Sequence, residues 1–122
     1  MAKHNELGQK GELLAQQLLE DKGYQVIATN WRHSRAEIDI IAKQPALLVF
    51  VEVKTRSNLS LGQPEEFVTP KKERLMASAA FAFMEQTDYN GEIRFDIISV
   101  HLPNHGLTQL KHIEDAFFPG LD

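Results

Sequence analysis

Two neighbouring apolar segments, residues 37–42 and 47–54, carry charged side chains within runs that otherwise suit the interior of a β-sheet. Both segments are rich in Val, Ile, Leu or Phe, a composition typical of buried strands. An isolated carboxylate in such a strand would face a desolvation cost of several kcal/mol. Glu37, Asp39 and Glu52 therefore need a compensating partner, which constrains both the fold and the chemistry of this chain.

The residues between the two segments predict a β-hairpin. Residues 43–46 read Lys-Gln-Pro-Ala and are suited to a turn. The hairpin would bring Asp39 beside Glu52, because opposed or diagonal residues on paired strands lie about 4.5–8 Å apart. Side chains alternate along a strand, so Glu52 and Lys54 point to the same face. Such a set suits a hard divalent cation with an activated water, although an ion pair at a partly exposed sheet end remains the alternative.

The rest of the pattern predicts a single domain with the order helix, three strands, helix, two strands. At 122 residues with 43% hydrophobic content, the chain is long enough to bury one core. Thr69 and Pro70 form a helix start, and Gly23 is placed to end the first helix. We expect helices at residues 5–22 and 70–87, strands at 24–28, 37–42, 47–54, 93–102 and 109–113, and loops at 29–36 and 56–64, the last at the mouth of the site.

Small residues surround Glu12 on the predicted first helix. Gly8, Gly11 and Ala15 are its neighbours on the helix surface, so the helix can approach another backbone or a phosphate closely there. We therefore expect Glu12 to reach the acids of the hairpin.

Basic residues are concentrated around the predicted hairpin and the start of the second helix. The net charge of −4 argues mildly against DNA binding, because phosphate neutralisation supplies most of the non-specific affinity. The clustering of the basic residues favours DNA binding. The alternative is that they are ordinary solvated charges. Eight of the thirteen basic residues lie in this region: Arg32, Arg35, Lys43, Lys54, Arg56, Lys71, Lys72 and Arg74.

Several classes of protein are excluded or disfavoured by what the sequence lacks. Without cysteine, disulfides and cysteine-based zinc sites are excluded, and a reducing cytoplasm is compatible. The first residues lack the apolar core of a signal peptide, and no apolar stretch approaches the roughly 20 residues that cross a bilayer. The Walker phosphate loop and the Gly-x-Ser-x-Gly elbow are also missing. We expect a cytoplasmic protein without a membrane anchor.

Five motifs in order resemble those of the YraN family, a small bacterial family of unassigned function. That family is similar to the archaeal Holliday junction resolvases of the PD-(D/E)xK nuclease superfamily, in which an acid ends one strand and an acid-x-lysine lies on the next. One departure is Ala36, which stands where the resemblance leads us to expect glycine. The motifs cover residues 8–15 (GQKGELLA), 30–32 (NWR), 37–39 (EID), 49–56 (VFVEVKTR) and 94–96 (RFD).

The resemblance implies a restriction-endonuclease-like α/β fold with an α-β-β-β-α-β core and a central mixed sheet flanked by helices, as one nuclease-like domain over residues 1–122. It implies a metal-dependent endonuclease acting on branched or otherwise structured DNA, with Mg²⁺ or Mn²⁺ as cofactor. Asp39, Glu52 and the backbone carbonyl of Val53 would bind the metal. Lys54 would orient the attacking water, and Glu12 would hold a second metal's water or a catalytic water.

Further residues receive supporting roles in this interpretation. Glu37 would lie in the outer shell of the site, and Asp96 would make a structural hydrogen bond or ion pair with Arg94 or Arg56. A four-way junction has approximate two-fold symmetry, so a homodimer would suit it. Phosphate contacts are expected from Arg32, Arg35, Arg56, Lys71 and Lys72.

A non-catalytic nucleic-acid-binding or adaptor protein on the same fold is the alternative function. The presence of all four predicted catalytic residues favours the enzyme, because a decayed enzyme commonly loses its lysine or an acid. These residues are Glu12, Asp39, Glu52 and Lys54.

Overall fold

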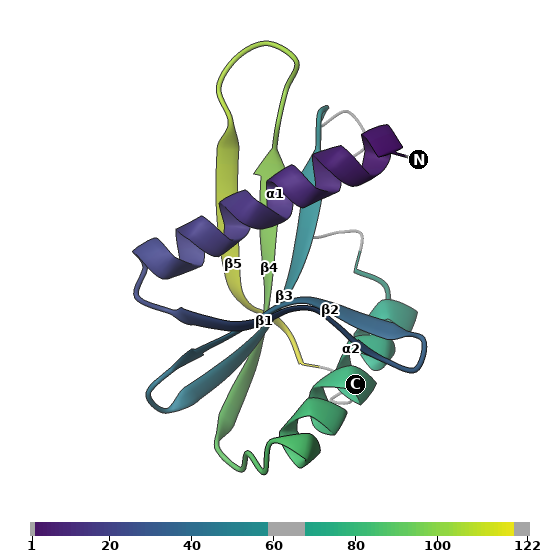
Figure 1. The fold of residues 1–122 in the computed structure, drawn as a ribbon, viewed down its shortest axis with the longest axis vertical. Coiled ribbons are helices and arrows are strands. Elements are labelled where there is room, and N and C mark those ends of the chain that lie inside the picture. Colours follow the sequence, from purple (N-terminus) through teal and green to yellow (C-terminus); the bar gives the residue numbers. More distant parts are fainter. Residues whose placement is uncertain (1, 59–67, 119–122) are drawn as a thin grey trace.

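A five-stranded mixed sheet with two helices forms the fold (Figure 1). The structure is a computed structural model and describes residues 2–58 and 68–118. The strands lie in the order β1-β2-β3-β4-β5, and β3 and β4 form the parallel pair, with α2 in the connection between them. The elements are α1 (Ala2–Asp21), β1 (Gln25–His33), β2 (Ala36–Gln44), β3 (Leu47–Arg56), α2 (Pro70–Gln86), β4 (Glu92–His101) and β5 (Gln109–Phe117). The expected fold class is therefore confirmed.

The two helices pack against different clusters of the core. Ala15 and Leu19 of α1 pack with Val49 and Val51 of β3, on one face of the sheet. Met76, Ala79, Ala80 and Phe83 of α2 pack with Leu48 and Phe50 of β3, on the other face. Because these β3 residues alternate between the two clusters, the same alternation assigns Glu52 and Lys54 to the α2 face.

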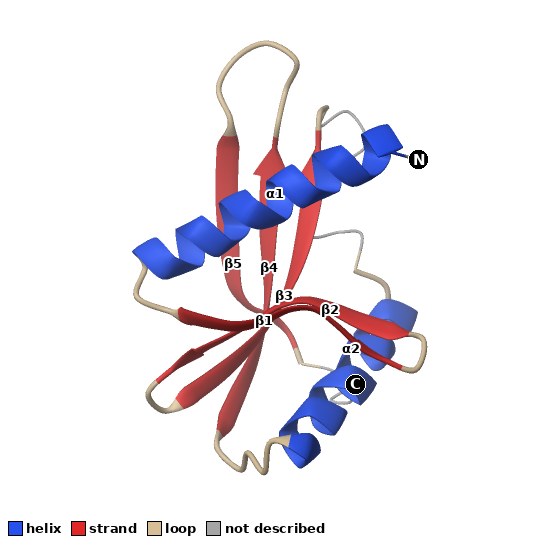
Figure 2. Ribbon diagram, viewed as in Figure 1, coloured by secondary structure: helices blue, strands red, loops and turns tan. Residues whose placement is uncertain are grey.

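The sheet is strongly twisted, so that β1 and β2 run at a steep angle to β4 and β5 (Figure 2). Within β2, Ile38 packs in the α2 cluster, whereas Ile40 packs in the α1 cluster. Residues two apart on a regular strand share a face, so β2 changes face at Asp39. Asn30, which the register places opposite Asp39, has a positive φ of 48°. The acid therefore lies at a local bend of the β1–β2 pair.

Three predicted boundaries need correction. The loop expected at residues 29–36 is wrong, because residues 29–33 continue β1 and only Ser34 and Arg35 form the turn. The final strand extends to Phe117, beyond the predicted residue 113. Arg56, expected to begin a loop, is the last residue of β3, and residues 59–64 of that loop lie outside the described part of the chain. At the β1–β2 turn the left-handed conformation falls on Ser34 (φ 57°) and not on Ala36, so the departure from glycine carries no backbone strain.

The start of α2 is fixed as the sequence predicted. Thr69 is the N-cap, its hydroxyl accepts a hydrogen bond from the Lys72 N–H at 3.2 Å, and Pro70 is in the first turn. This cap places Lys71 and Lys72 in the first turn of α2, the next described element after β3.

A buried ionic network ties β4 to β5 and to the end of α1. Asp96 is fully buried and accepts hydrogen bonds from the guanidinium of Arg94, at 2.8 Å to each oxygen, and from the N–H of Asp115 at 3.0 Å. Its other partner is His112 Nε2 at 2.7 Å. Lys22 Nζ lies 2.7 Å from His112 Nδ1. An ammonium only donates, so Nδ1 accepts and Nε2 carries the proton donated to Asp96.

This network confirms the predicted pairing of Asp96 with Arg94. Burial raises the pKa of Asp96, but the hydrogen bonds from His112, Arg94 and the Asp115 N–H outweigh burial and lower it. Asp96 is therefore an ionised structural residue of the sheet.

Among the described residues, none of the helices combines the length and the apolar character needed to cross a membrane.

Candidate functional site

Asp39 and Glu52 meet where the regular pairing of β2 with β3 stops. Ile40 and Val51 form the last regular pair, and the next residues outward are Asp39 and Glu52. The Asp39 carboxylate accepts a hydrogen bond from the Val53 N–H at 2.8 Å. The side chain of Asp39 thus bonds to β3 beyond the regular ladder, which fixes it beside Glu52 as the hairpin predicted.

Glu52 is the most buried acid of this group, with 3% of its surface exposed. Its Oε2 lies 3.4 Å from Lys54 Nζ and also 3.4 Å from Lys72 Nζ. Lys54 comes from the same strand, as expected, whereas Lys72 comes from the first turn of α2. Glu52 Oε1 is buried and has no hydrogen-bond partner. One oxygen of Glu52 is thus compensated by two ammonium groups, while the other is not compensated by any hydrogen bond.

Glu12, on α1, interacts electrostatically with the acids of the hairpin. Its Oε1 accepts a hydrogen bond from Asn30 Nδ2 at 3.0 Å. Burial raises the pKa of Glu12, the hydrogen bond from Asn30 lowers it, and the negative charges of Glu37 and Glu52 raise it further, so that the net shift is upward. The structure therefore brings Glu12 into the field of the hairpin acids, as expected.

Gly11 makes the close approach of α1 to β3, whereas Gly8 does not. A Cβ built on Gly11 would lie 1.9 Å from Thr55 Oγ1, and Thr55 directly follows Lys54. A Cβ on Gly8 would meet nothing within 4 Å, so the expectation that Gly8 also permits close packing is wrong. Ala15 is fully buried against the core.

The carboxyl of Asp39 has its pKa raised to about 7. Burial is the largest cause, followed by the negative charge of Glu52; the hydrogen bond from the Val53 N–H lowers it, and Glu12 and Lys72 make smaller contributions of opposite sign. Three acids, Glu12, Asp39 and Glu52, thus share two ammonium groups. The group is short of positive charge when all three are ionised.

The donors of the site fit a hard divalent cation. In the described parts of the chain, no three His, Asp or Glu side chains are grouped so as to hold a metal by themselves. Mg²⁺ is usually bound by only one or two carboxylates and keeps several waters, which matches Asp39 and Glu52 with backbone oxygens. The buried Glu52 Oε1 without a hydrogen bond is the atom that most requires such a partner.

The basic residues predicted to contact phosphate have different environments. Arg32 is exposed and lies 3.8 Å from Glu37, which is half-buried; Arg35 and Lys71 are exposed, and Arg56 is half-buried. Lys72, in contrast, pairs with Glu52 inside the site. Helical spacing contained the signal for Lys72, because it lies four residues before the fully buried Met76 and so on the same face of α2.

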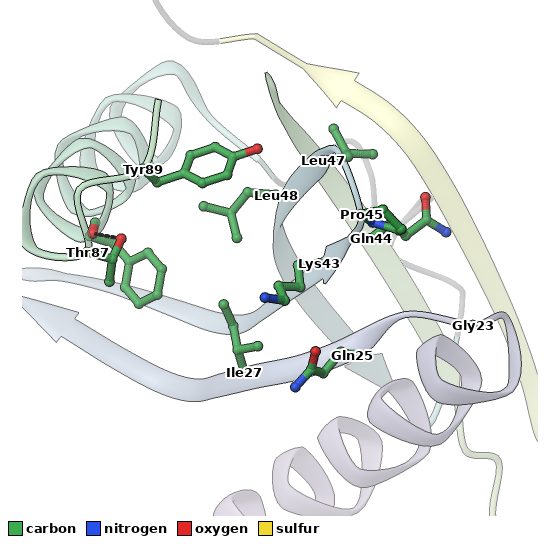
Figure 3. A pocket seen from close by; sticks show the side chains of 11 residues that line it. Gly23, Gln25, Ile27, Lys43, Gln44, Pro45, Leu47, Leu48, Thr87 and Tyr89 are labelled. Carbon is green, nitrogen blue, oxygen red and sulfur yellow. Dashed lines mark hydrogen bonds between the residues drawn. The ribbon is translucent and has the colours of Figure 1, made fainter. Parts of the chain in front are cut away.

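Of two cavities lined by described residues, the smaller one lies beside Glu12 and the larger one lies away from the acids. A hollow of about 240 Å³ borders Glu12 and Asn30 and is completed by Gln9, Leu13 and Gln16. A larger cavity of about 450 Å³ lies at the opposite end of β2, where Lys43, Tyr89 and Leu48 are among its lining residues (Figure 3). The lining of the larger cavity contains no carboxylate, so it lacks the chemistry that the acid cluster offers.

Comparison with known proteins gives a family for the chain. The family model of UPF0102, described as an uncharacterised protein family, matches residues 11–100, the stretch that holds Glu12 and the acids and lysines of the site. A UPF0102 protein of Flavobacterium psychrophilum is 46% identical over 118 residues, which are 97% of this chain and 98% of that protein. Another, from Bacteroides thetaiotaomicron, is 45% identical over 121 residues, or 99% of each chain. The chain therefore belongs to the UPF0102 family, the YraN family that its motifs resemble.

Proposed function

We propose that this protein is a metal-dependent endonuclease that hydrolyses phosphodiester bonds in branched or otherwise structured DNA. The observation that carries the proposal is the buried Glu52, which has one oxygen without a hydrogen bond and lies beside Asp39 and Lys54. A buried carboxylate in this state is costly unless it binds a cation. The order of the strands and helices, shared with restriction-endonuclease-like cores, supports the proposal by analogy.

The roles of the site residues follow from their positions. Asp39, Glu52 and the backbone carbonyl of Val53 would hold Mg²⁺ or Mn²⁺. Such an ion, when bound, lowers the pKa of a coordinated water and offsets charge on the phosphate. Lys54 would orient the attacking water and donate to the phosphate oxygen on which negative charge develops. Glu12, held by Asn30, would orient a second water.

Other residues would bind and position the DNA. Glu37, half-buried two residues before Asp39, would act from the outer shell by its charge on Glu12 and its ion pair with Arg32. Arg35 and Lys71, which are exposed, would contact phosphates of the DNA backbone. Arg32, near the end of β1, and Arg56, at the end of β3, would complete the phosphate-binding surface.

A branched substrate and a homodimer form the finer part of the proposal. A four-way junction has approximate two-fold symmetry, and two copies of a single-site domain could make two symmetric cuts. The resemblance to junction resolvases supports this choice. Light scattering of the protein with and without a junction should show a dimer on the DNA, and a monomer in both conditions would reject this part of the proposal.

The activity is tested by incubating purified protein with four-way junctions, flaps, duplexes and single strands in Mg²⁺ or Mn²⁺. An Asp39→Asn protein, prepared identically, is the matched control, because it keeps the size of the side chain and an acceptor for the Val53 N–H. We expect wild type to cut branched DNA and the control to be inactive. Equal cleavage by the two preparations would indicate a contaminating nuclease and would contradict the proposal.

A non-catalytic nucleic-acid-binding or adaptor role is the second candidate. The observation that favours it is that Lys54 Nζ and Lys72 Nζ each lie 3.4 Å from Glu52 Oε2 and compensate its charge. In that case the protein should bind branched DNA equally well in EDTA and in Mn²⁺, and no substrate of the panel should be cut.

A further inference from the structure

Lys72 is the one residue of the site that comes from α2. Its Nζ lies 3.4 Å from Glu52 Oε2, the same distance as Lys54 Nζ. Its backbone is fixed at the same time, because its N–H donates to the N-cap hydroxyl of Thr69. Since Met76 is fully buried one turn later, Lys72 extends from the face of α2 that packs on the sheet.

The position of Lys72 is unfavourable apart from its contact with Glu52. An ammonium in the first turn of a helix opposes the helix dipole, and the side chain of Lys72 is only 38% exposed. Its positive charge also acts on Asp39, where it opposes the effect of Glu52. The positive charge of Lys72 therefore acts on both carboxylates that would hold a divalent ion. Lys72 and the ion would compensate the same negative charges.

We propose that Lys72 is a resident counter-ion of this site, paired with Glu52 in the metal-free protein and displaced from Glu52 when a divalent cation binds. This inference rests on the proposed function, because it assumes a cation at Asp39 and Glu52. The cation and Lys72 compete for Glu52, so each weakens the binding of the other. Once displaced, the ammonium lies at the N-terminus of α2, where the positive end of the helix dipole also favours an anion such as a phosphodiester.

Lys72→Met tests the competition directly, with calorimetric titration of Mn²⁺ and thermal unfolding as readouts. Removal of the competing cation should tighten Mn²⁺ binding by about tenfold, because an opposite charge within about 4–6 Å changes the proton affinity of a carboxylate by about 1–3 pKa units. In EDTA the variant should unfold at a lower temperature than wild type, because Glu52 has lost one of its two ion pairs. Saturating Mn²⁺ should remove most of that difference.

Two further variants separate the counter-ion role from a general effect of charge. Lys71→Met removes the same charge from the same turn, but Lys71 is exposed, so Mn²⁺ affinity and unfolding temperature should stay close to wild type. Lys72→Arg keeps the positive charge and should retain the Mn²⁺ affinity of wild type.

The possible results distinguish this inference from the proposed function. A folded Lys72→Met protein that binds Mn²⁺ no more tightly than wild type overturns the displacement of Lys72, while the nuclease proposal stands. An unfolding temperature in EDTA equal to that of wild type overturns the pairing of Lys72 with Glu52. Absence of Mn²⁺ binding by wild type itself overturns the proposed metal-dependent function, and the displacement with it.

Discussion

Asp39 gives the site a dependence on pH because its folded-state pKa is raised from 3.8 to about 7. A group with a raised pKa holds its proton more tightly in the folded than in the unfolded protein. Its contribution to stability is therefore full below about pH 4 and is lost as the pH rises through about 7. Above that pH, ionised Asp39 lies buried beside Glu52 at a cost in free energy.

Asp39→Asn should therefore stabilise the metal-free protein at about pH 8 more than at about pH 5, because the amide does not ionise. Thermal unfolding in EDTA at the two pH values measures this effect. A difference between variant and wild type that stays constant with pH, or that shrinks as the pH rises, would contradict the raised pKa.

Replacement of Lys54 should slow phosphodiester cleavage strongly while changing the affinity for DNA little. Lys54→Ala should reduce cleavage of branched DNA by roughly two to three orders of magnitude, as is typical when a single group that stabilises transition-state charge is removed. DNA binding should persist, because the exposed basic residues remain. Single-turnover cleavage and a binding titration on the same preparation test both statements, and unaltered cleavage by a folded variant would remove Lys54 from the mechanism.

At the scale of residues, the sequence predicts that Asp39 and Glu52 lie side by side, but it does not predict that Lys72 pairs with Glu52. Asp39 and Glu52 follow from strand alternation and one hairpin turn, both of which are local rules. The partner of Lys72 depends on how α2 crosses the sheet, and tertiary packing decides that. The sequence therefore indicated a phosphate contact for Lys72, whereas its side chain pairs with Glu52.

At the scale of elements, α1 is positioned by Gly11. An added Cβ there would lie 1.9 Å from Thr55 Oγ1 and 2.9 Å from Thr55 Cβ, and the β-branched Thr55 has little freedom to move aside. Because Glu12 is the next residue, the approach of α1 to β3 also determines where the Glu12 carboxylate lies.

Gly11→Ala should lower the free energy of unfolding by about 1–3 kcal/mol, the typical cost of overpacking. Gly8→Ala is the matched control, because its Cβ would enter open space. That change should leave the stability unchanged or raise it by about 0.5–1 kcal/mol through helix propensity. Denaturant unfolding of both variants decides the matter, and equal effects of the two substitutions would show that α1 does not depend on this contact.

The elements themselves were predictable except in β1. Residues 29–33 read Thr-Asn-Trp-Arg-His, which resembles a loop because polar residues dominate. They pair with β2 along the edge of the sheet, where polar side chains face solvent, and Trp31 packs edge-to-face on Phe83 at 5.3 Å between ring centroids. An edge strand needs only alternate apolar residues, and one large aromatic residue was sufficient here.

At the scale of the whole molecule, the order of elements follows from the sequence, while the contacts that join distant elements do not. Lys22 and His112 are 90 residues apart and meet only because β5 returns beside β4. Apart from the pairing of Asp96 with Arg94, two residues away, no local pattern indicates the network around Asp96. The resemblance to a nuclease core implied the correct fold class, and the pattern of apolar and turn-forming residues predicted the order of the elements.

The charge distribution leads to a prediction at the same scale. Arg35 lies in the turn before β2, close in sequence to Glu37, whereas Lys43 lies near the other end of β2, at the larger cavity. Arg35→Ala should weaken binding to branched DNA and reduce the slope of log affinity against log salt by about one. Lys43→Ala should change neither quantity, and equal effects of the two would mean that DNA does not bind at the acid-bearing end.

Calorimetric titration of Mn²⁺ tests the central claim most directly, because it examines the metal site apart from any substrate. Wild type should bind Mn²⁺ through Asp39 and Glu52, and Asp39→Asn or Glu52→Gln should weaken that binding by at least about tenfold, since each removes one charged oxygen ligand. Glu114→Gln, at an acid that pairs with Lys22 far along the chain, is the control and should bind like wild type. Equal affinity and stoichiometry for wild type and Asp39→Asn would contradict the account.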